Sequence, residues 1–157
     1  MTDRRIALLL TRPLAQSKGF VNIFEGVSQP SPVHICISPL FEIIFQGPLP
    51  DMSPYRSLIF TSSNGVRAFS QLKPSSILPS FTVGKVTAET AISVGLPAQM
   101  LGLDVQDFTE AILSLKPETP CLHLRGDISR SALATQLSNA GLATDEAIVY
   151  RQRGLPL

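Results

Sequence analysis

Short apolar runs alternate with amphipathic stretches along most of the chain. The first run, Ile6–Leu10, is continuous, which is typical of a strand covered on both faces. The apolar spacing over residues 14–24 then predicts a helix, and Val33–Ile37 predicts a second strand. Residues 1–38 therefore form one βαβ unit, which cannot bury both faces of a sheet by itself. We expect it to be an incomplete part of a domain.

A regular alternation of strands and helices follows between residues 54 and 150. Five apolar runs predict strands, at 57–61, 81–83, 98–101, 121–124 and 143–150. The stretches between them have helical spacing, at 66–72, 87–94, 105–115 and 130–140. Strands that alternate with helices imply βαβ units and a parallel sheet. We therefore predict an α/β fold with a doubly wound, parallel five-stranded sheet domain and a partial second α/β domain.

The boundary between these parts is marked by its composition. Leu40–Phe45 is apolar and extended, and Pro and Gly cluster from Gly47 to Pro54. Such a cluster is typical of a linker. We predict an incomplete domain over 1–38, a linker over 39–53 and a complete domain over 54–150.

Composition and charge exclude several classes of protein. The chain has 157 residues, 44% of them hydrophobic and 16% charged, which is unlike a disordered chain. A net charge of +1 gives no global electrostatic case for nucleic acid, and no apolar stretch is long enough to span a membrane. Cys36 and Cys121 have no CxxC spacing, so we expect buried free thiols in a reducing cytoplasm rather than zinc or disulfides.

Polar clusters stand where the predicted strands end. They are Thr11–Pro13, Thr61–Asn64, Gly84–Thr87 and Leu124–Asp127, each just before a helix. Free N–H groups at helix starts, hydroxyls and guanidinium groups all favour anions. We therefore expect an anionic ligand over the strand ends. The clusters contain Arg12, Ser62, Ser63, Asn64, Gly84, Thr87, Arg125 and Gly126.

A simpler explanation stands beside this one, since Ser, Thr and Asn before a helix are usually caps and an Arg after a strand is usually solvated. His34 is best interpreted as a core or edge histidine, and His123 lies beside a candidate loop. Asp127 and Glu146 could act as an acid and a base, but solvated side chains fit them better. No motif for phosphoryl transfer, hydride transfer or zinc hydrolysis is present.

Six segments together carry a family resemblance. They are LLLTRP, SPLFEI, LIFTSSNGVRAF, FTVGKVTAETAISVG, LHLRGDISRSALATQLSNAG and AIVYRQR, and in this order and spacing the chain resembles uroporphyrinogen-III synthase. The resemblance implies two α/β domains joined by a two-stranded linker, with a chain that returns to complete the first domain. Residues 151–157 would then be the second linker and the start of that return. Family members continue for about half a domain beyond this point, so we expect a C-terminally shortened member, either as a gene product or as a piece of a longer chain.

The resemblance also implies an activity. Members of the family cyclise hydroxymethylbilane to uroporphyrinogen III, with loss of water and inversion of ring D through a spiro intermediate. They use no metal and no organic cofactor, and they act as monomers without nucleic acid or membrane. For this chain we expect the same substrate and product and a cytoplasmic location, and the activity of the shortened form is left open. Self-association through the incomplete domain is left open.

Site residues follow from the same resemblance. Tyr150 matches a tyrosine proposed to assist departure of the hydroxyl as an acid, and Thr87 matches a threonine of the cleft. Ser62, Ser63 and Asn64 match a loop that binds substrate carboxylates. Further residues that we expect to contact these carboxylates are Arg12, Gly84, Arg125 and Gly126. Two alternatives stay open at this point: a non-catalytic α/β module that binds a small anion or serves in assembly, and a structural dimer formed by strand or domain exchange.

Overall fold

The computed structural model describes residues 6–27, 33–74, 76–129 and 131–156. The described chain divides into two compact units. The larger unit is Phe45–Arg151, and the smaller one combines the residues up to Ile44 with those from Gln152 onward.

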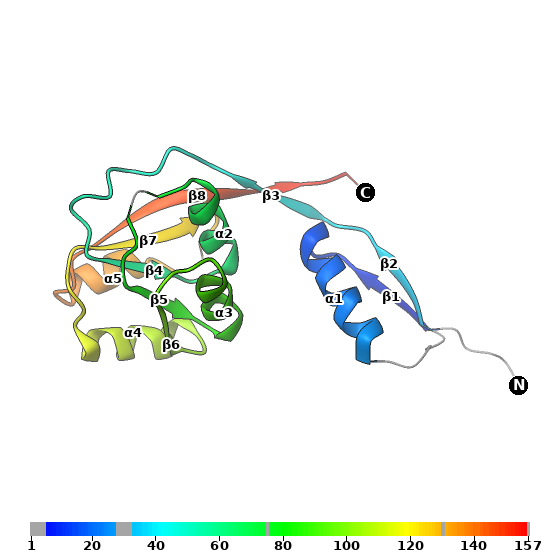
Figure 1. Cartoon of the computed structure of the whole chain (residues 1–157), viewed down its shortest axis with the longest axis horizontal. Helices are drawn as coiled ribbons and strands as arrows, with labels where there is room; N and C mark the ends of the chain where they lie inside the picture. Colours follow the sequence, from blue (N-terminus) through cyan, green and yellow to red (C-terminus); the bar gives the residue numbers. More distant parts are fainter. Residues whose placement is uncertain (1–5, 28–32, 75, 130, 157) are drawn as a thin grey trace, which may run out of the picture. The chain divides into compact units, whose positions relative to one another are not determined.

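A six-stranded sheet forms the centre of the larger unit (Figure 1). Its strands are β3 (Phe41–Phe45), β4 (Ser57–Phe60), β5 (Ser80–Val83), β6 (Ala98–Gly102), β7 (Cys121–Gly126) and β8 (Thr144–Gly154). Their order is β3-β8-β7-β4-β5-β6, and the five strands from β4 to β8 pair in parallel. These are the five strands predicted from the sequence, so the α/β fold class with its parallel sheet is confirmed.

The strand order reverses direction between β4 and β7. From β4 the chain proceeds outward through β5 to β6, and it then crosses back to add β7 and β8 on the other side of β4. In open α/β sheets, such a switch point leaves a crevice beyond the carboxyl ends of the two central strands, and ligands bind there. The topology therefore predicts a ligand site at the segments that follow β4 and β7.

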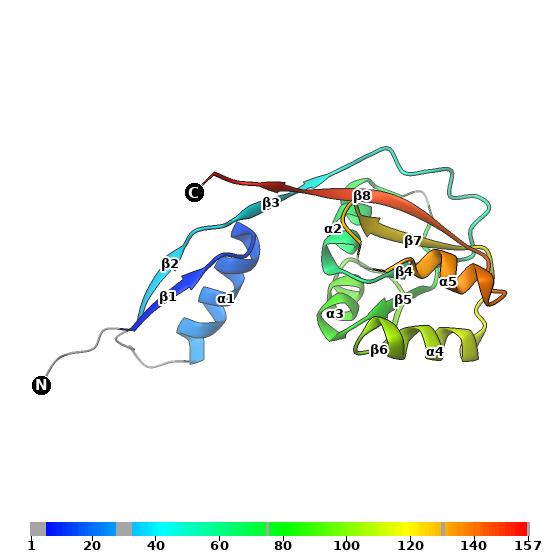
Figure 2. The same cartoon turned by 180° about the vertical axis from the view of Figure 1, so that it is seen from behind.

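Two pairs of helices cover the sheet on opposite faces (Figures 1 and 2). The helices are α2 (Ser63–Gln71), α3 (Lys85–Ser93), α4 (Val105–Leu115) and α5 (Leu133–Asn139). Helices α2 and α3 contact each other on one face, and α4 contacts α5 on the other. All four were predicted. However, α2 begins at Ser63 rather than at residue 66, α3 begins at Lys85 rather than at residue 87, and α5 begins at Leu133 rather than at residue 130.

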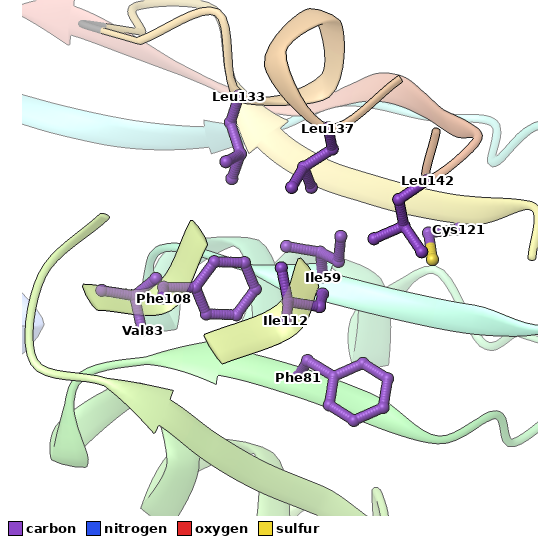
Figure 3. Close-up of a cluster of buried hydrophobic side chains, with 9 residues drawn as sticks. All are labelled: Ile59, Phe81, Val83, Phe108, Ile112, Cys121, Leu133, Leu137 and Leu142. Carbon is purple, nitrogen blue, oxygen red and sulfur yellow. The ribbon is translucent and has the colours of Figure 1, made fainter. Parts of the chain in front are cut away.

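Successive side chains of a strand point to opposite faces of the sheet, so each face has its own hydrophobic core. On one face the T-shaped pair of Phe60 and Phe69, with ring centroids 5.7 Å apart, joins β4 to α2. The cluster on the other face, shown in Figure 3, contains Ile59, Phe81, Val83, Phe108, Ile112, Cys121, Leu133, Leu137 and Leu142. Full burial of one Leu, Ile or Phe side chain contributes about 1.5–3 kcal/mol. This packing holds the strand ends in fixed positions.

The segment predicted as an extended linker contains β3. Leu155 N donates to Leu40 O at 2.9 Å, and Gln46 N donates to Val149 O at 2.8 Å. Residue numbers rise along β3 as they fall along β8, so the two strands are antiparallel. The apolar, β-branched and aromatic residues of β3 favour this pairing. A sixth strand is thus added to the five that were predicted.

Besides most of β3 and the end of β8, the described part of the smaller unit contains one parallel strand pair and one helix. Strands β1 (Ile6–Leu10) and β2 (Val33–Ile37) pair in register, and α1 (Leu14–Val27) connects them. The expectation that the first strand is covered on both faces is wrong for the described structure, because only Leu10 is buried and Ile6 is 61% exposed. One helix can cover only one face of two strands.

The two cysteines differ in burial. Cys121 lies fully buried in β7, as predicted, whereas Cys36 is exposed in β2. The prediction of burial for Cys36 is therefore wrong, because β2 has a face that no described element covers. His34, expected in the core or at an edge, is exposed on the same strand.

Candidate functional site

Three of the four polar clusters lie at one edge of the larger unit's sheet. Strands β4, β5 and β7 are parallel, so their carboxyl ends meet at this edge. The ends of β4 and β7 are in direct contact, with Thr61 Oγ1 3.2 Å from His123 Nε2. Arg12 belongs to the smaller unit, where it is exposed after β1 and its carbonyl accepts the hydroxyl of Ser17 at 3.0 Å.

The segment after β4 caps helix α2. Ser62 is the N-cap residue with an extended backbone, and its hydroxyl accepts the N–H of Asn64 at 3.2 Å. Arg67 donates to Ser63 Oγ at 3.2 Å and to Asn64 Oδ1 at 3.4 Å. Arg67 was not predicted from the sequence, although its spacing of three and four residues from these side chains on a helix could have identified it.

Gly65 allows α2 to approach β7 closely. A Cβ at this position would come within 2.8 Å of the carbonyl oxygen of Leu124. A backbone oxygen cannot move aside as the end of a flexible side chain can. The absence of a side chain at Gly65 therefore fixes the start of α2 against the end of β7, at the switch point.

The segment after β5 begins helix α3. Gly84 is the N-cap residue, and its φ of +74° lies in the region that favours glycine. Its N–H donates to the carbonyl of Gly102 at 2.8 Å. Thr87 lies in the first turn of α3 and is only 6% exposed. Both predicted residues thus lie at the end of β5, which neighbours β4.

His123 is a buried neutral base beneath this edge. It is 2% exposed, and this burial lowers its pKa to about 4. The negative charge of Glu146 raises this pKa and the positive charge of Arg125 lowers it, but both effects are smaller than that of burial. Its Nε2 contacts the Thr61 hydroxyl, whereas its Nδ1 has no hydrogen-bond partner among the residues that the structure describes.

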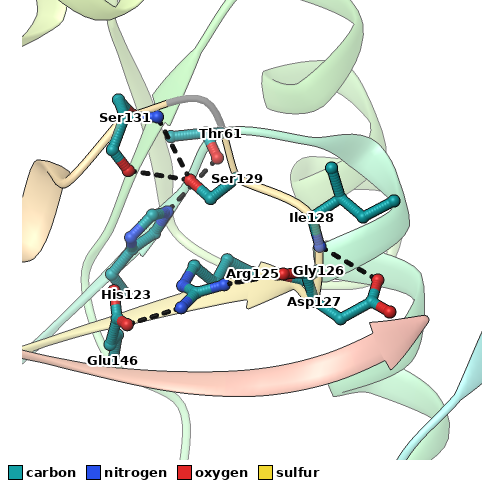
Figure 4. A network of polar contacts seen from close by, with 9 residues as sticks. All are labelled: Thr61, His123, Arg125, Gly126, Asp127, Ile128, Ser129, Ser131 and Glu146. Carbon is teal, nitrogen blue, oxygen red and sulfur yellow. Dashed lines mark hydrogen bonds and ion pairs between the residues drawn. The ribbon is translucent and has the colours of Figure 1, made fainter. Parts of the chain in front are cut away.

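Arg125 is bound by groups of the protein itself, as Figure 4 shows. Its Nη2 lies 2.6 Å from Glu146 Oε1, and its Nη1 donates to the carbonyl of Gly126 at 2.7 Å. The hydrogen bond from Arg125 lowers the pKa of Glu146, and the same bond raises the pKa of Arg125. Glu146 is therefore the ion-pair partner of Arg125 rather than a fully solvated residue.

A polar pocket of about 350 Å³ lies beside this ion pair. Its walls are the side chains and loop residues Arg125, Asp127, Ser129, Ser131, Ala132, Thr135 and Glu146. Charges of both signs and several hydroxyls face it, so it suits a ligand that both donates and accepts hydrogen bonds.

Tyr150 lies against the last residue of β7. It is 6% exposed and pairs with Gly126, beyond an irregularity in the register of β7 and β8. A Cβ at Gly126 would come within 2.5 Å of Cε2 of the ring. The N–H of Asp127 donates to the carbonyl of Tyr150 at 3.0 Å. The close approach of Gly126 therefore leaves the ring little freedom to move.

Among residues 6–27, 33–74, 76–129 and 131–156, no three His, Cys, Asp or Glu side chains lie together as a metal site. None of the helices described has the length and apolar character that a bilayer span requires.

The fold of the chain is similar to that of solved protein structures. Two solved structures are similar to it: uroporphyrinogen-III synthetase from Helicobacter pylori (TM-score 0.67, 21% identity, covering 98% of this chain) and a mutant uroporphyrinogen III synthase from Thermus thermophilus (TM-score 0.58, 16% identity, covering 96%). In both, the chain spans 64% of the other protein's length. At these identities the likeness shows the fold. No curated protein matches the sequence.

The family is assigned from the sequence, and not from the fold alone. The family model for "Uroporphyrinogen-III synthase HemD" matches residues 32–155, which is well over half of the chain. This region includes all of the larger unit, with the strand ends, Arg125 and Tyr150 described above. The chain therefore belongs to the uroporphyrinogen-III synthase HemD family.

Proposed function

We propose that the chain acts in the cyclisation of hydroxymethylbilane to uroporphyrinogen III, as a hydro-lyase of tetrapyrrole and haem biosynthesis. The observation that carries the proposal is the family match over residues 32–155. The polar edge at the switch point of the sheet is consistent with it, because the substrate carries many carboxylates. A non-catalytic binding or assembly module of the same fold is not favoured by this match.

In the proposed reaction Tyr150 is the general acid. Its phenol proton passes to the hydroxyl of the substrate's hydroxymethyl group. The C–O bond then breaks, water departs, and the remaining substrate is an azafulvene-like cation. A carbon of ring D attacks this cation to form the spiro intermediate, which reopens and closes again with ring D inverted. A proton lost on final closure restores the phenol. Much of the catalysis is positional, because the same cation closes to isomer I without the enzyme.

The carboxylates of the substrate are held at the strand ends in this proposal. Helices α2 and α3 both begin at this edge, and a helix start favours anions. Ser62, Ser63 and Asn64 act after β4, Gly84 and Thr87 after β5, and Arg125 and Gly126 after β7. Arg12, in the smaller unit, is proposed to contact another carboxylate.

The proposal also covers location, cofactors, domain boundaries and oligomeric state. The reaction is placed in the cytoplasm, consistent with two free cysteines in a reducing compartment. No metal, organic cofactor, nucleic acid or membrane is needed for it. The boundaries at 1–38, 39–53, 54–150 and 151–157 are proposed as the functional division of the chain, with the family's monomeric state.

The test is an assay with freshly generated hydroxymethylbilane, in which isomers III and I are separated and counted. We expect isomer III in excess over the protein-free reaction. The chain contains two tyrosines, so Tyr150→Phe has a matched control in Tyr55→Phe, whose hydroxyl contacts Asp145 at 3.0 Å. Tyr150→Phe should lower kcat and Tyr55→Phe should not. Isomer I alone, at the protein-free rate, would overturn the proposal, and binding without turnover would support the non-catalytic module instead.

A further inference from the structure

The peptide unit between Gly126 and Asp127 is held at both ends. Its carbonyl, on Gly126, accepts Nη1 of Arg125 at 2.7 Å. Its N–H, on Asp127, donates to the carbonyl of Tyr150 at 3.0 Å. The C=O and N–H of a trans peptide point in opposite directions, so a group that fixes one end also directs the other. The position of the Arg125 guanidinium therefore influences the position of the Tyr150 backbone, because both are hydrogen-bonded to the same rigid peptide plane.

The same peptide also contacts the ring of Tyr150. The Cα of Gly126 is so close to the ring that a Cβ there would lie 2.6 Å from Cζ and 2.9 Å from the hydroxyl oxygen. Gly126 and Tyr150 are paired across the strands, just beyond the irregularity in the register of β7 and β8. Irregularities of this kind re-aim a side chain. A shift of this peptide would consequently move both the backbone and the ring of Tyr150.

Glu146 fixes the guanidinium that fixes this peptide. The side chain of Arg125 is only 17% exposed, and its Nη2 lies 2.6 Å from Glu146 Oε1. Its Nη1 also lies 3.4 Å from the carbonyl of Asp127. A planar guanidinium can bind a carboxylate and a carbonyl at the same time, which an ammonium group does less well. Without Glu146, the guanidinium would be free to turn away from the Gly126 carbonyl.

We infer that Glu146 is a positioning residue for Tyr150, acting through Arg125 and the Gly126–Asp127 peptide. This inference rests on the proposed function, in which Tyr150 is the acid. It also changes the role of Arg125, because a guanidinium engaged by Glu146 and two carbonyls acts as a clamp rather than as a free ligand for carboxylates. The two roles differ in what they require of the side chain. A clamp requires the planar shape of the arginine guanidinium, whereas contact with a substrate carboxylate requires only a positive charge, which lysine also carries.

The experiment compares Glu146→Ala and Arg125→Lys with the unmodified chain. If the clamp positions Tyr150, each variant should lower kcat by about threefold to tenfold and change KM by less than about twofold. The double variant should be no worse than the poorer single one, because both changes break one unit. Glu146→Gln, which keeps the size and one acceptor oxygen, should be intermediate and guards against a failure of the alanine variant to fold.

Glu42→Ala is the matched control. Glu42 accepts Nε of Arg153 at 2.6 Å, so its replacement removes another Glu–Arg pair that involves β8, but one that does not contact the Gly126–Asp127 peptide. We expect its kcat and KM to be unchanged. A retained kcat with a raised KM for Arg125→Lys or Glu146→Ala would overturn the inference and make Arg125 a substrate contact.

A second measurement does not depend on activity. The chain has no Trp, so in a Tyr55→Phe background Tyr150 is the only strong intrinsic fluorophore. Glu146→Ala and Arg125→Lys should make the emission of Tyr150 easier to quench with acrylamide, and Glu42→Ala should not. Unchanged quenching in both clamp variants would overturn the inference even if the chain is active. A clear increase in quenching with no turnover by the unmodified chain would leave the positioning intact and refute only the proposed function.

Discussion

Gly126 and Tyr150 are packed so closely that the glycine has no room for a side chain. A methyl group at Gly126 would lie 2.5 Å from Cε2 of the tyrosine ring, closer than any real carbon contact. Gly126 ends β7, and Tyr150 occupies the matching position of β8. Glycine is therefore required here by close packing and not by an unusual backbone angle.

Gly126→Ala should displace the Tyr150 ring. Because the ring is buried, relief of the clash requires movement of β7, β8 or both, and overpacking of this kind typically costs about 1–3 kcal/mol. Denaturant unfolding should show this loss, and kcat should fall with it in the isomer assay. The control is Gly154→Ala, since nothing lies within 4 Å of a Cβ there. Equal stability of the two variants would contradict the prediction.

The polar pattern of the sequence was enough to find the carboxyl edge of the sheet, although not the switch point within it. Apolar runs identified the five parallel strands, and the residues after 57–61, 81–83 and 121–124 then had to meet at one edge, since parallel strands end together. The predicted site residues of the larger unit lie there, but the proposal that they bind substrate stays a prediction. Arg12 lies in the other unit, and the predicted domain boundaries likewise stay predictions.

Contacts between distant residues were beyond the sequence. Nothing in the spacing of Arg125 and Glu146 reveals that β7 and β8 are neighbours in register, so their ion pair could not be foreseen. For the same reason, Arg125 looked like a free cation. Periodicity also failed for Leu40–Phe45, because an apolar stretch of this length does not show whether a partner strand exists. Its partner, β8, lies about a hundred residues further along the chain.

The cap at Ser62 and the cap at Asp104 offer a matched pair of variants. Ser62 accepts the N–H of Asn64 at 3.2 Å, and Asp104 Oδ1 accepts that of Asp107 at 2.9 Å. Loss of either cap should lower the free energy of unfolding by about 1 kcal/mol. Only Ser62 lies at the switch point, whereas Asp104 follows the far edge strand β6. Ser62→Ala should therefore raise KM by about threefold or more, and Asp104→Ala should leave KM unchanged.

Similar effects of the two cap variants on KM would contradict this assignment. A rise in KM for both would mean that helix stability, and not the loop after β4, controls binding. An unchanged KM for both would mean that main-chain N–H groups hold the substrate without the Ser62 hydroxyl. Thermal unfolding of each variant checks that the stability losses match.

The two thiols should differ sharply in reactivity. Cys121 is fully buried, and its burial raises the pKa of its thiol, so the reactive thiolate is disfavoured. Cys36 is exposed. A water-soluble thiol reagent such as dithionitrobenzoate should therefore label one cysteine of the folded chain and both in denaturant. Cys36→Ser should abolish the labelling of the folded chain, and fast labelling of that variant would show that Cys121 is accessible.

His123 should make stability depend on pH. Its pKa is about 4 in the folded protein and near the ordinary 6.5 in the unfolded chain, so between these values only the unfolded state binds the proton. The free energy of unfolding should thus be highest above pH 6.5 and fall by about 3 kcal/mol as the pH approaches 4. Denaturant titrations at about pH 7 and about pH 5 measure the first part of this fall, about 2 kcal/mol, largely apart from the carboxylates. His123→Phe should remove most of it, and His34→Asn, at the exposed histidine, should keep it; a fall that survives in His123→Phe would assign the dependence to other groups.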